Sequence, residues 1–394
     1  MMPPPMDTAT ILINELSSLA SQVSFNIDQN ARNKALQLGQ QLVAELEQPE
    51  NMAVDLAFSP LVAVAARIAV ELELFKHISS TKAPINSKEL SLLSGGEELF
   101  IIRILRPLSS IGFVKEVGER TWESTPITHA MVNEGIAAGH RVAGEMVVGA
   151  ATKAPRYFKE AGYHCPTDPR DGLTQYAFQT KLSAFQLYSS MPRILKDFNM
   201  FMGNTMGARS YWIDWYPVHE RLLNGSVQDL PLLVDVGGGK GHDLLAFHQK
   251  YPAQGRLVLQ DLATVMENIR DIHPIEPVAY DFFTEQPVHG ARAYFYHHIL
   301  HDWSDVKCLE ILKQVKNAMK PGYSKLLIHE MIIPEQGASK FHAMLDLTMM
   351  VFNAGMERTE RQWEELLHKA GLKVVKFWTA QADADGIVEA ILDE

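Results

Sequence analysis

The chain has 394 residues, and 46% of them are hydrophobic, which is enough apolar material for two or three domains with real cores. Its 47 acidic residues outnumber 36 basic ones, and the resulting net charge of −11 argues against nucleic acid as a partner. Two cysteines, Cys165 and Cys308, are too few for a disulfide framework or a cysteine-rich metal site.

The N-terminus carries no recognisable targeting segment. Residues 1–10 are rich in proline and are expected to form a disordered tail. They lack the basic region and apolar core of a signal peptide, and no apolar run reaches the roughly 18 residues of a membrane span. We therefore expect a cytoplasmic protein without a membrane partner.

Residues 11–150 are predicted to form a mainly helical, winged-helix-like dimerisation domain. Helical periodicity covers residues 10–47, and residues 56–70 are apolar nearly all round, which predicts a buried helix. Helices near 87–90 and 98–108 precede two strands, 112–117 and 121–125, around Gly118. A winged helix can bind DNA, but this one offers few cations, so dimerisation is favoured. One small subdomain can hardly cover the 56–70 segment, so a homodimer is expected.

Residues 151–225 are predicted to be a helical linker that lines a substrate site. The stretch from 157 to 223 has helical character and is rich in aromatic residues and methionines. Methionine adapts to irregular apolar shapes, so this stretch suits a pocket for a flat organic molecule. For any single side chain, packing in the core is the alternative.

Residues 226–394 alternate strands with segments of helical length, which predicts a doubly wound α/β domain. The strands are expected near Val234, Leu257, Ala293, Leu326, Val374 and Val388. Too few residues join the last two for a helical crossover, so these two should pair antiparallel.

The first of these strands runs into a glycine-rich turn, Gly237-Gly238-Gly239-Lys240-Gly241. The spacing departs from the dinucleotide fingerprint and from the phosphate-binding loop of nucleotide triphosphatases. Asp261 ends the next strand, where it is placed to bind ribose hydroxyls. An adenosine ligand without phosphates fits this combination, and S-adenosylmethionine is such a ligand.

Three histidines, His297, His298 and His301, follow the strand at residues 293–296. They raise the possibility of zinc, but no matching set of Cys, Asp or Glu ligands stands at metal spacing, so no metal is expected. A single histidine that acts as a base is favoured, because imidazole titrates near neutral pH and can accept a proton from a phenol or enol.

Five motifs in order make the chain resemble the plant and fungal small-molecule O-methyltransferases of the caffeate and flavonoid type. They are Val234-Asp235-Val236-Gly237-Gly238-Gly239, Asp261-Leu262, Asp281-Phe282, His301-Asp302-Trp303-Ser304-Asp305 and Glu357-Arg358-Thr359. Gly112-Phe113 and residues 163–169 are similar to the fungal branch, whose members modify polyketides and other secondary metabolites.

The resemblance implies a Rossmann-like methyltransferase domain with S-adenosylmethionine as cofactor, and it assigns roles to single residues. His301 would be the general base, flanked by Glu330 and Glu357. The cofactor would contact Gly237, Gly239, Asp261, Asp281, Phe282 and His297, although plant relatives have lysine where this chain has His297. The phenolic or polyketide acceptor would contact Phe198, Met202, Met349 and Asn353.

Two other functions stay open. Some fungal members of this family catalyse pericyclic reactions of a polyketide with little or no methyl transfer. A pericyclase needs a hydrogen-bond donor more than a base, so His301 with Glu330 and Glu357 favours methyl transfer. The third possibility, a silent binding protein, is disfavoured because all three polar positions are filled.

Overall fold

The computed structural model describes residues 7–22, 28–205, 211–270, 272–379 and 385–393. They belong to two compact units, Met1–His129 and Ala130–Glu394. The sequence predicts a domain boundary near residue 150 instead. The helix between the two boundaries, α9 (Glu134–Val142), packs along α14 (Pro192–Thr205), which places it in the second unit.

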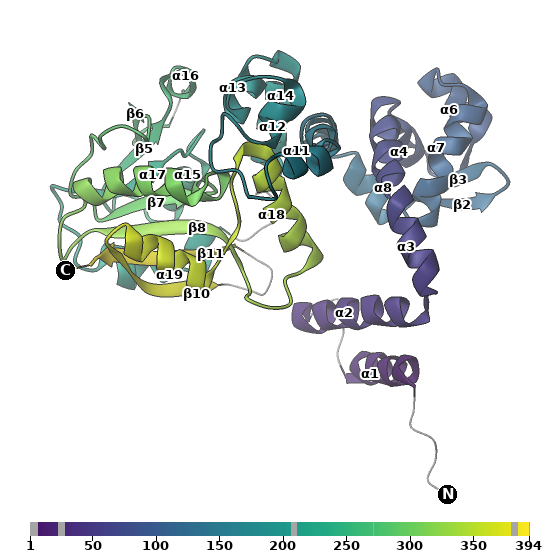
Figure 1. Cartoon of the computed structure of the whole chain (residues 1–394), viewed down its shortest axis with the longest axis horizontal. Helices are drawn as coiled ribbons and strands as arrows, with labels where there is room; N and C mark the ends of the chain where they lie inside the picture. Colours follow the sequence, from purple (N-terminus) through teal and green to yellow (C-terminus); the bar gives the residue numbers. More distant parts are fainter. Residues whose placement is uncertain (1–6, 23–27, 206–210, 271, 380–384, 394) are drawn as a thin grey trace, which may run out of the picture. The chain divides into compact units, whose positions relative to one another are not determined.

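The first unit is helical with one small sheet (Figure 1). Its strands pair antiparallel in the order β1-β3-β2, and the turn between β2 and β3 lies at the predicted place around Gly118. Asn86 caps α6 through a capping box with Glu89. The elements are α1 (Thr8–Gln22), α2 (Gln29–Leu46), α3 (Pro49–Phe58), α4 (Pro60–Glu71), α5 (Leu74–Ser80), β1 (Ile85–Asn86), α6 (Ser87–Ser94), α7 (Glu98–Ser110), β2 (Val114–Gly118) and β3 (Thr121–Ser124); α8 (Pro126–Met131) crosses the division between the units.

α1 begins at Thr8, inside the segment 1–10 that the sequence predicts to be disordered, and residues 1–6 lie outside the described residues. The prediction of one buried helix over residues 56–70 is wrong. Pro60 starts a new helix, and Leu56, Phe58 and Leu61 are 72%, 61% and 63% exposed. The residues of α4 that are fully buried are alanines, Ala65, Ala66 and Ala69. The apolar side chains on the other faces therefore remain available for a partner.

No single helix among the described residues is long and apolar enough to cross a membrane. α3 and α4 together reach the length and apolar composition of a membrane span, but the two helices are bent by 42° where they meet.

The second unit begins with helices, as predicted for residues 157–223. They are α9, η1 (Ala143–Val148), α10 (Gly149–Ala151), α11 (Ala154–Glu160), α12 (Leu173–Phe178), α13 (Ala184–Ser189), α14, η3 (Trp212–Asp214) and η4 (His219–Leu223). Buried aromatic and aliphatic side chains from η1, α13, α14 and α18 (Lys340–Asn353) form one cluster.

A mostly parallel sheet forms the rest of this unit, in the order β10-β11-β8-β7-β4-β5-β6. Its strands are β4 (Pro231–Val236), β5 (Arg256–Asp261), β6 (Glu276–Ala279), β7 (Ala293–His297), β8 (Lys325–Ile333), β10 (Leu372–Thr379) and β11 (Asp385–Leu392), while β9 (Arg358–Thr359) pairs with β8 off this path. β10 and β11 are antiparallel, as predicted. The α/β fold class is confirmed. The sheet also contains β6, a strand that the sequence did not predict.

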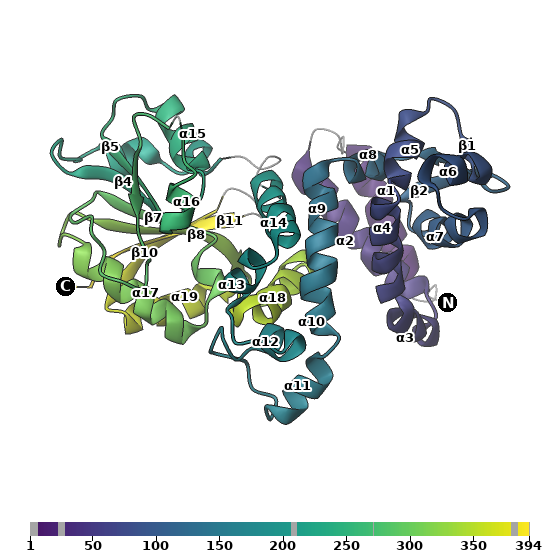
Figure 2. The same cartoon turned by 90° about the horizontal axis from the view of Figure 1, so that it is seen from above.

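Helices cover both faces of the sheet (Figure 2), and alternating side chains of the central strands pack against different helices. Val234 of β4 and Tyr294 of β7 join α17 (Asp305–Ala318) and α19 (Glu360–Lys369) on one face. Leu233 and Phe295 join α15 (His242–Lys250), η3 and η4 on the other. Burial on both faces leaves the carboxyl ends of the parallel strands as the place for polar chemistry.

Candidate active site

His301 lies in η5 (Leu300–Asp302), which begins three residues after the end of β7, and is 8% exposed. Its Nδ1 is 2.7 Å from Oε1 of Glu357, the residue before β9, and 3.7 Å from Oε2 of Glu330 on β8. Both carboxylates are buried. The three predicted catalytic residues therefore meet in one place.

Backbone hydrogen bonds fix the segment that carries this histidine. Glu330 Oε1 accepts the N–H groups of Ile299, Leu300 and His301 at 3.1, 2.8 and 3.3 Å. The His301 carbonyl oxygen accepts the Met356 N–H at 2.9 Å. Glu330 thus acts as an anchor for the loop, while Glu357 makes the close contact with the ring.

Burial controls the charge of the carboxyl groups here. It raises the pKa of Glu357 from 4.5 to about 7. Burial also raises the pKa of Asp302 from 3.8 to about 7, although the neighbouring His301 opposes the change. Asp302 Oδ1 lies 3.6 Å from His301 Nε2. The site therefore changes its charge around neutral pH.

The glycine turn after β4 adopts backbone conformations that favour glycine, with φ of +76° at Gly237 and +58° at Gly239. A Cβ at Gly237 would lie 2.6 Å from Ile299 Cδ1, so this turn touches the segment before His301. No described atom lies within 4 Å of the place that a Cβ at Gly239 would take. This open cradle lies beside Asp261, whose Oδ2 accepts the Gly239 N–H at 2.9 Å.

The predicted cofactor residues line the same edge of the sheet. Asp261 uses its carboxylate for two backbone N–H groups, from Gly239 and Leu262, and a carboxylate has capacity for further donors such as ribose hydroxyls. Asp281 follows β6, which is paired with β5, so it lies near Asp261 at the strand ends. Phe282 packs edge-on against Trp303, with ring centroids 5.9 Å apart.

His297 ends β7 and binds Oδ2 of Asp243, in the first turn of α15, through Nδ1 at 2.7 Å. The pair ties the helix after the glycine turn to the strand before the segment that carries His301. His297 Nε2 is buried and has no hydrogen-bond partner among the described residues. An open cradle beside the glycine turn, a strand-end carboxylate and an unpartnered buried nitrogen are a set of groups that fits an adenosine ligand with an amino-acid tail.

The predicted substrate residues fall into two groups. Phe198 stacks on Phe352 at 6.1 Å, and Met349 is buried on α18. Met202 is 43% exposed on α14. Asn353 has structural hydrogen bonds, because its Nδ2 donates to the Asp302 carbonyl and its Oδ1 accepts the Ala184 N–H. Asn353 thus braces the loop next to His301.

Sequence reasoning missed several polar partners of the site. The Arg358 guanidinium is fully buried and donates to the carbonyl oxygens of Leu300 and Trp303 and to Asp305. His298 stacks on His301, and its Nε2 lies 3.2 Å from Asp385 Oδ1. The sequence placed His298 in the histidine cluster and Arg358 beside Glu357 without giving either a role, and Asp385 gave no signal because its place depends on strand register.

Two groups of side chains each bring three potential metal ligands within 4.8 Å of one another. One is His301, Glu330 and Glu357, and the other is His297, His298 and Asp385. Donor atoms about 2.0–2.1 Å from a tetrahedral zinc ion stand about 3.3 Å apart. The 2.7 Å between His301 and Glu357 is instead a hydrogen-bond distance.

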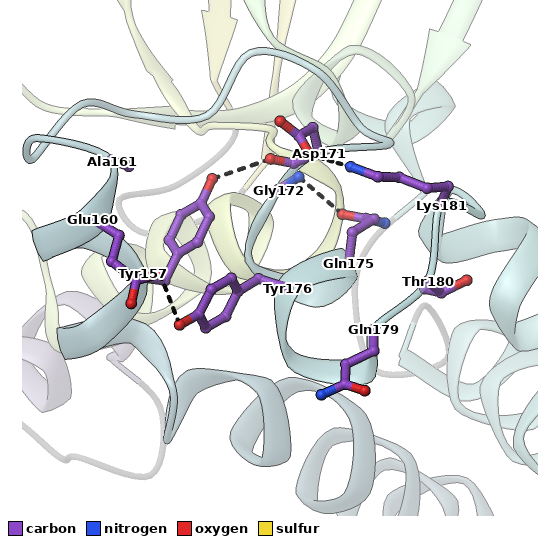
Figure 3. Close-up of a pocket in the computed structure, with 10 residues that line it drawn as sticks. All are labelled: Tyr157, Glu160, Ala161, Asp171, Gly172, Gln175, Tyr176, Gln179, Thr180 and Lys181. Atoms are coloured by element: carbon purple, nitrogen blue, oxygen red, sulfur yellow. Dashed lines mark hydrogen bonds and ion pairs between the residues drawn. The ribbon is translucent and has the colours of Figure 1, made fainter.

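A groove of about 480 Å³ lies elsewhere in the second unit, around α11 and α12 (Figure 3). Its lining includes none of the predicted site residues. Its polar groups bind one another: the Tyr157 hydroxyl donates to the Asp171 carbonyl oxygen, and the Tyr176 hydroxyl donates to Glu160. We place the chemistry at the histidine site, where buried groups with shifted charge converge, and not in this groove.

Comparison with known proteins gives a consistent picture. An O-methyltransferase domain profile matches residues 182–373. The chain is 51% identical to the O-methyltransferase penC of Penicillium thymicola, with 98% of this chain and 97% of the relative covered. It is 53% identical to the O-methyltransferase asqD of Emericella nidulans, with 84% and 87% covered. It is 31% identical to a demethylsterigmatocystin 6-O-methyltransferase of Aspergillus flavus, with 86% and 88% covered.

Solved structures of similar proteins include one described by its reaction and others described by their bound molecules. A structure described as a pericyclic reaction enzyme is 29% identical, has a TM-score of 0.86 and covers 97% of this chain and 100% of its own. The LepI complex with SAM is similar at 29% identity and a TM-score of 0.86, with 98% and 99% covered. OxaC in complex with sinefungin and meleagrin has 27% identity and a TM-score of 0.86, with 98% of each chain covered.

Proposed function

As this chain belongs to the O-methyltransferase family, whose members use S-adenosylmethionine, we propose that it methylates a hydroxyl group of a phenolic or polyketide-type secondary metabolite, with His301 as general base. The names of penC, asqD and the demethylsterigmatocystin enzyme support O-methylation. The observation that carries the base assignment is the buried pair of His301 and Glu357, 2.7 Å apart.

The pair sets the direction of proton transfer. When Nδ1 donates its proton to Glu357, Nε2 keeps the lone pair that accepts the proton of the acceptor hydroxyl. Above about pH 7 the Glu357 carboxylate is ionised, and it then stabilises the imidazolium as this forms. Glu330 holds the backbone of the segment in place through three N–H groups.

S-Adenosylmethionine, when bound, supplies a methyl group on a positively charged sulfur. We assign its binding to the backbone at Gly237 and Gly239, and to Asp261, Asp281, Phe282 and His297. The protein excludes water around the reacting hydroxyl, since His301, Glu330 and Glu357 are all nearly fully buried. As the methyl group passed to the hydroxyl oxygen, the sulfur–methyl bond would break and S-adenosylhomocysteine would leave with its electron pair, while His301 Nε2 would take the hydroxyl proton.

An aromatic wall supports a flat acceptor. The rings of Phe185, Tyr188, Phe198 and Phe352 contact one another, and Phe185 stacks on Trp303 two residues after His301. Met349 adds an adaptable side chain on α18. We therefore assign Phe198, Met202 and Met349 to the acceptor and give Asn353 the task of bracing its pocket.

Incubation with methyl-labelled S-adenosylmethionine and a panel of phenolic and polyketide compounds tests this function. We expect the label in a product that is heavier by one methyl group. Absence of labelled product, with cofactor binding established by calorimetry, would contradict methyl transfer.

The similarity to the pericyclic reaction enzyme supports one second candidate. In that case, the same pocket rearranges a polyketide without methyl transfer. Conversion of a polyketide to an isomer without label, retained in His301→Gln, would establish this alternative.

A further inference from the structure

A second group of polar side chains lies next to the proposed base. His297 ends β7, His298 follows it, and Asp385 begins β11. One ligand atom of each side chain, a ring nitrogen or a carboxylate oxygen, lies within 4.8 Å of the other two. The sequence alone shows no metal-ligand spacing here, because only the register of the sheet brings the carboxylate to the two histidines.

The orientation of His297 is typical of a metal ligand. Its Nδ1 lies 2.7 Å from Oδ2 of Asp243, and its side chain is 8% exposed. Histidines that bind metals commonly donate one ring N–H to a carboxylate, which fixes the ring and leaves the other nitrogen for the ion. Here the other nitrogen, Nε2, is buried and makes no hydrogen bond to any described residue. It therefore lacks the partner that a buried polar atom normally has.

His298 and Asp385 supply two further donor atoms. Nε2 of His298 lies 3.2 Å from Oδ1 of Asp385, whose side chain is 5% exposed. Two ligand atoms on a tetrahedral zinc ion stand about 3.3 Å apart, so this separation suits a shared ion. The His298 side chain is 30% exposed, which gives its ring room to turn towards His297.

The charges around this group favour a cation. Burial opposes positive charge on His298, but the adjacent Asp385 and the nearby Glu330 and Glu357 raise its pKa to about 9. A divalent ion carries more positive charge into the same surroundings, and it displaces the proton when it binds.

The other group of potential ligands is already engaged in hydrogen bonds. His301 Nδ1 lies 2.7 Å from Glu357, and Glu330 Oε1 accepts three backbone N–H groups. The Nε2 atoms of His297 and His298, by contrast, make no hydrogen bond within the described part of the chain. The donors that are available for a metal ion therefore lie in the second group.

We propose that His297, His298 and Asp385 bind a divalent transition metal ion of the zinc type in the cofactor-free chain, with Asp243 as the residue that positions His297. Two histidines and one carboxylate are a ligand set that zinc uses in proteins, with the fourth position left for water or another small ligand.

The metal site shares one atom with the proposed function. His297 is also assigned to the cofactor, and its Nε2 cannot bind a metal ion and S-adenosylmethionine at the same time. The ion and the cofactor should therefore compete. This consequence rests on the proposed function, whereas the metal site itself does not.

Calorimetric titration of the full, cofactor-free chain with Zn²⁺ alone tests the site. We expect the wild type to bind one ion per chain. His297→Gln, His298→Asn and Asp385→Asn should each weaken binding by about 100-fold or more, and Asp243→Asn by roughly 10–100-fold, because it removes the partner of a ligand. Asparagine suits position 298, because it tolerates the positive φ of +51° there.

Two control variants separate this site from other histidines. His301→Gln alters the other group of potential ligands, and His289→Asn alters an exposed histidine. Both should bind Zn²⁺ as the wild type does. Circular dichroism establishes that each variant is folded, and should His298→Asn fail to fold, His297→Gln and Asp385→Asn decide.

A wild type that binds no Zn²⁺ overturns the proposal, and so does unchanged binding in folded His297→Gln and Asp385→Asn. Binding that is lost only in His301→Gln also overturns it, because the ion would then lie with Glu330 and Glu357.

Titration with S-adenosylhomocysteine at saturating Zn²⁺ separates the metal site from the cofactor assignment. We expect Zn²⁺ to weaken S-adenosylhomocysteine binding in the wild type and to have no effect in His298→Asn. If Zn²⁺ binds as expected but leaves the affinity for S-adenosylhomocysteine unchanged, the metal site is supported and the assignment of His297 to the cofactor fails.

Discussion

His301 differs from the neighbouring histidines in the number of carboxylates that it contacts. Among the ion pairs of the described residues, it meets Glu357, Glu330 and Asp302, whereas His297 and His298 each pair with one carboxylate. A buried imidazole with several carboxylates can accept a proton and keep the resulting charge stabilised. This difference supports His301 as the base.

The raised pKa of Glu357 can be tested by comparing the pH dependence of stability in the wild type and in Glu357→Gln. The folded protein raises the pKa of Glu357 from 4.5 to about 7, so between these values it holds a proton that the unfolded chain has released. The contribution of Glu357 to the free energy of unfolding is therefore full below pH 4.5 and falls as pH rises towards 7. From pH 4.5 to 7 the wild type should lose about 3 kcal/mol more than Glu357→Gln. Chemical denaturation at several pH values measures this, and equal slopes for both proteins would contradict it.

The resemblance singled out the three residues that meet at the site. His301 and Glu357 belong to two of its five ordered motifs, and Glu330, which stands outside those motifs, was assigned from the resemblance alone. Asp385 was beyond reach, because it depends on register: Gly386 pairs with Glu330, which brings the preceding residue to the site. The contact of Asp243 with His297 was not predicted either, because it depends on how the first turn of α15 places Asp243.

At the scale of elements, the glycine turn gives a matched experiment. Gly239 and Gly95 both have positive φ, +58° and +73°, and a Cβ at either would have no described atom within 4 Å. Alanine at either should cost roughly 1–2 kcal/mol of stability through the backbone. Only Gly239→Ala should weaken binding of S-adenosylhomocysteine, by about tenfold or more, because its methyl group fills the cradle. Equal affinity of both variants for S-adenosylhomocysteine, measured by calorimetry, would contradict the assignment of Gly239 to the cofactor site.

Arg358, on β9, holds the segment around His301 against the start of α17. Lysine offers one point charge in place of the planar fork, so buried carbonyl oxygens of Leu300 and Trp303 lose their donors. We expect Arg358→Lys to lower the free energy of unfolding by about 2–4 kcal/mol. Arg361→Lys is the control, since that arginine is 71% exposed, and should change it by less than about 0.5 kcal/mol. Similar losses in the free energy of unfolding from both substitutions would contradict this structural role of Arg358.

The positions of six strands and the antiparallel pairing of the last two followed from the sequence, because long apolar runs bounded by turns identify buried strands. β6 was missed because Glu276–Ala279 is short and alternates between exposed and half-buried positions. The prediction that residues 56–70 are buried was wrong for this chain by itself. An apolar sequence indicates that a surface is covered, but it does not identify the chain that covers it.

At the scale of the whole molecule, the exposed apolar residues of the first unit predict a homodimer. Leu46, Leu56, Phe58 and Leu61 are all more than 60% exposed. Light scattering should give twice the mass of one chain at micromolar concentration. Leu56→Asp with Phe58→Asp should give a monomer, while Leu92→Asp, at an 85% exposed position on α6, should leave the dimer intact. A monomeric wild type would contradict the prediction.

His301→Gln tests most directly whether this histidine is the base for methyl transfer. With an acceptor found by label transfer, the rate of a single turnover is measured together with cofactor affinity. We expect the rate to fall by roughly 10²–10⁴-fold while the affinity stays nearly unchanged, because the base acts chiefly in the transition state. Transfer at the wild-type rate in His301→Gln would contradict the assignment.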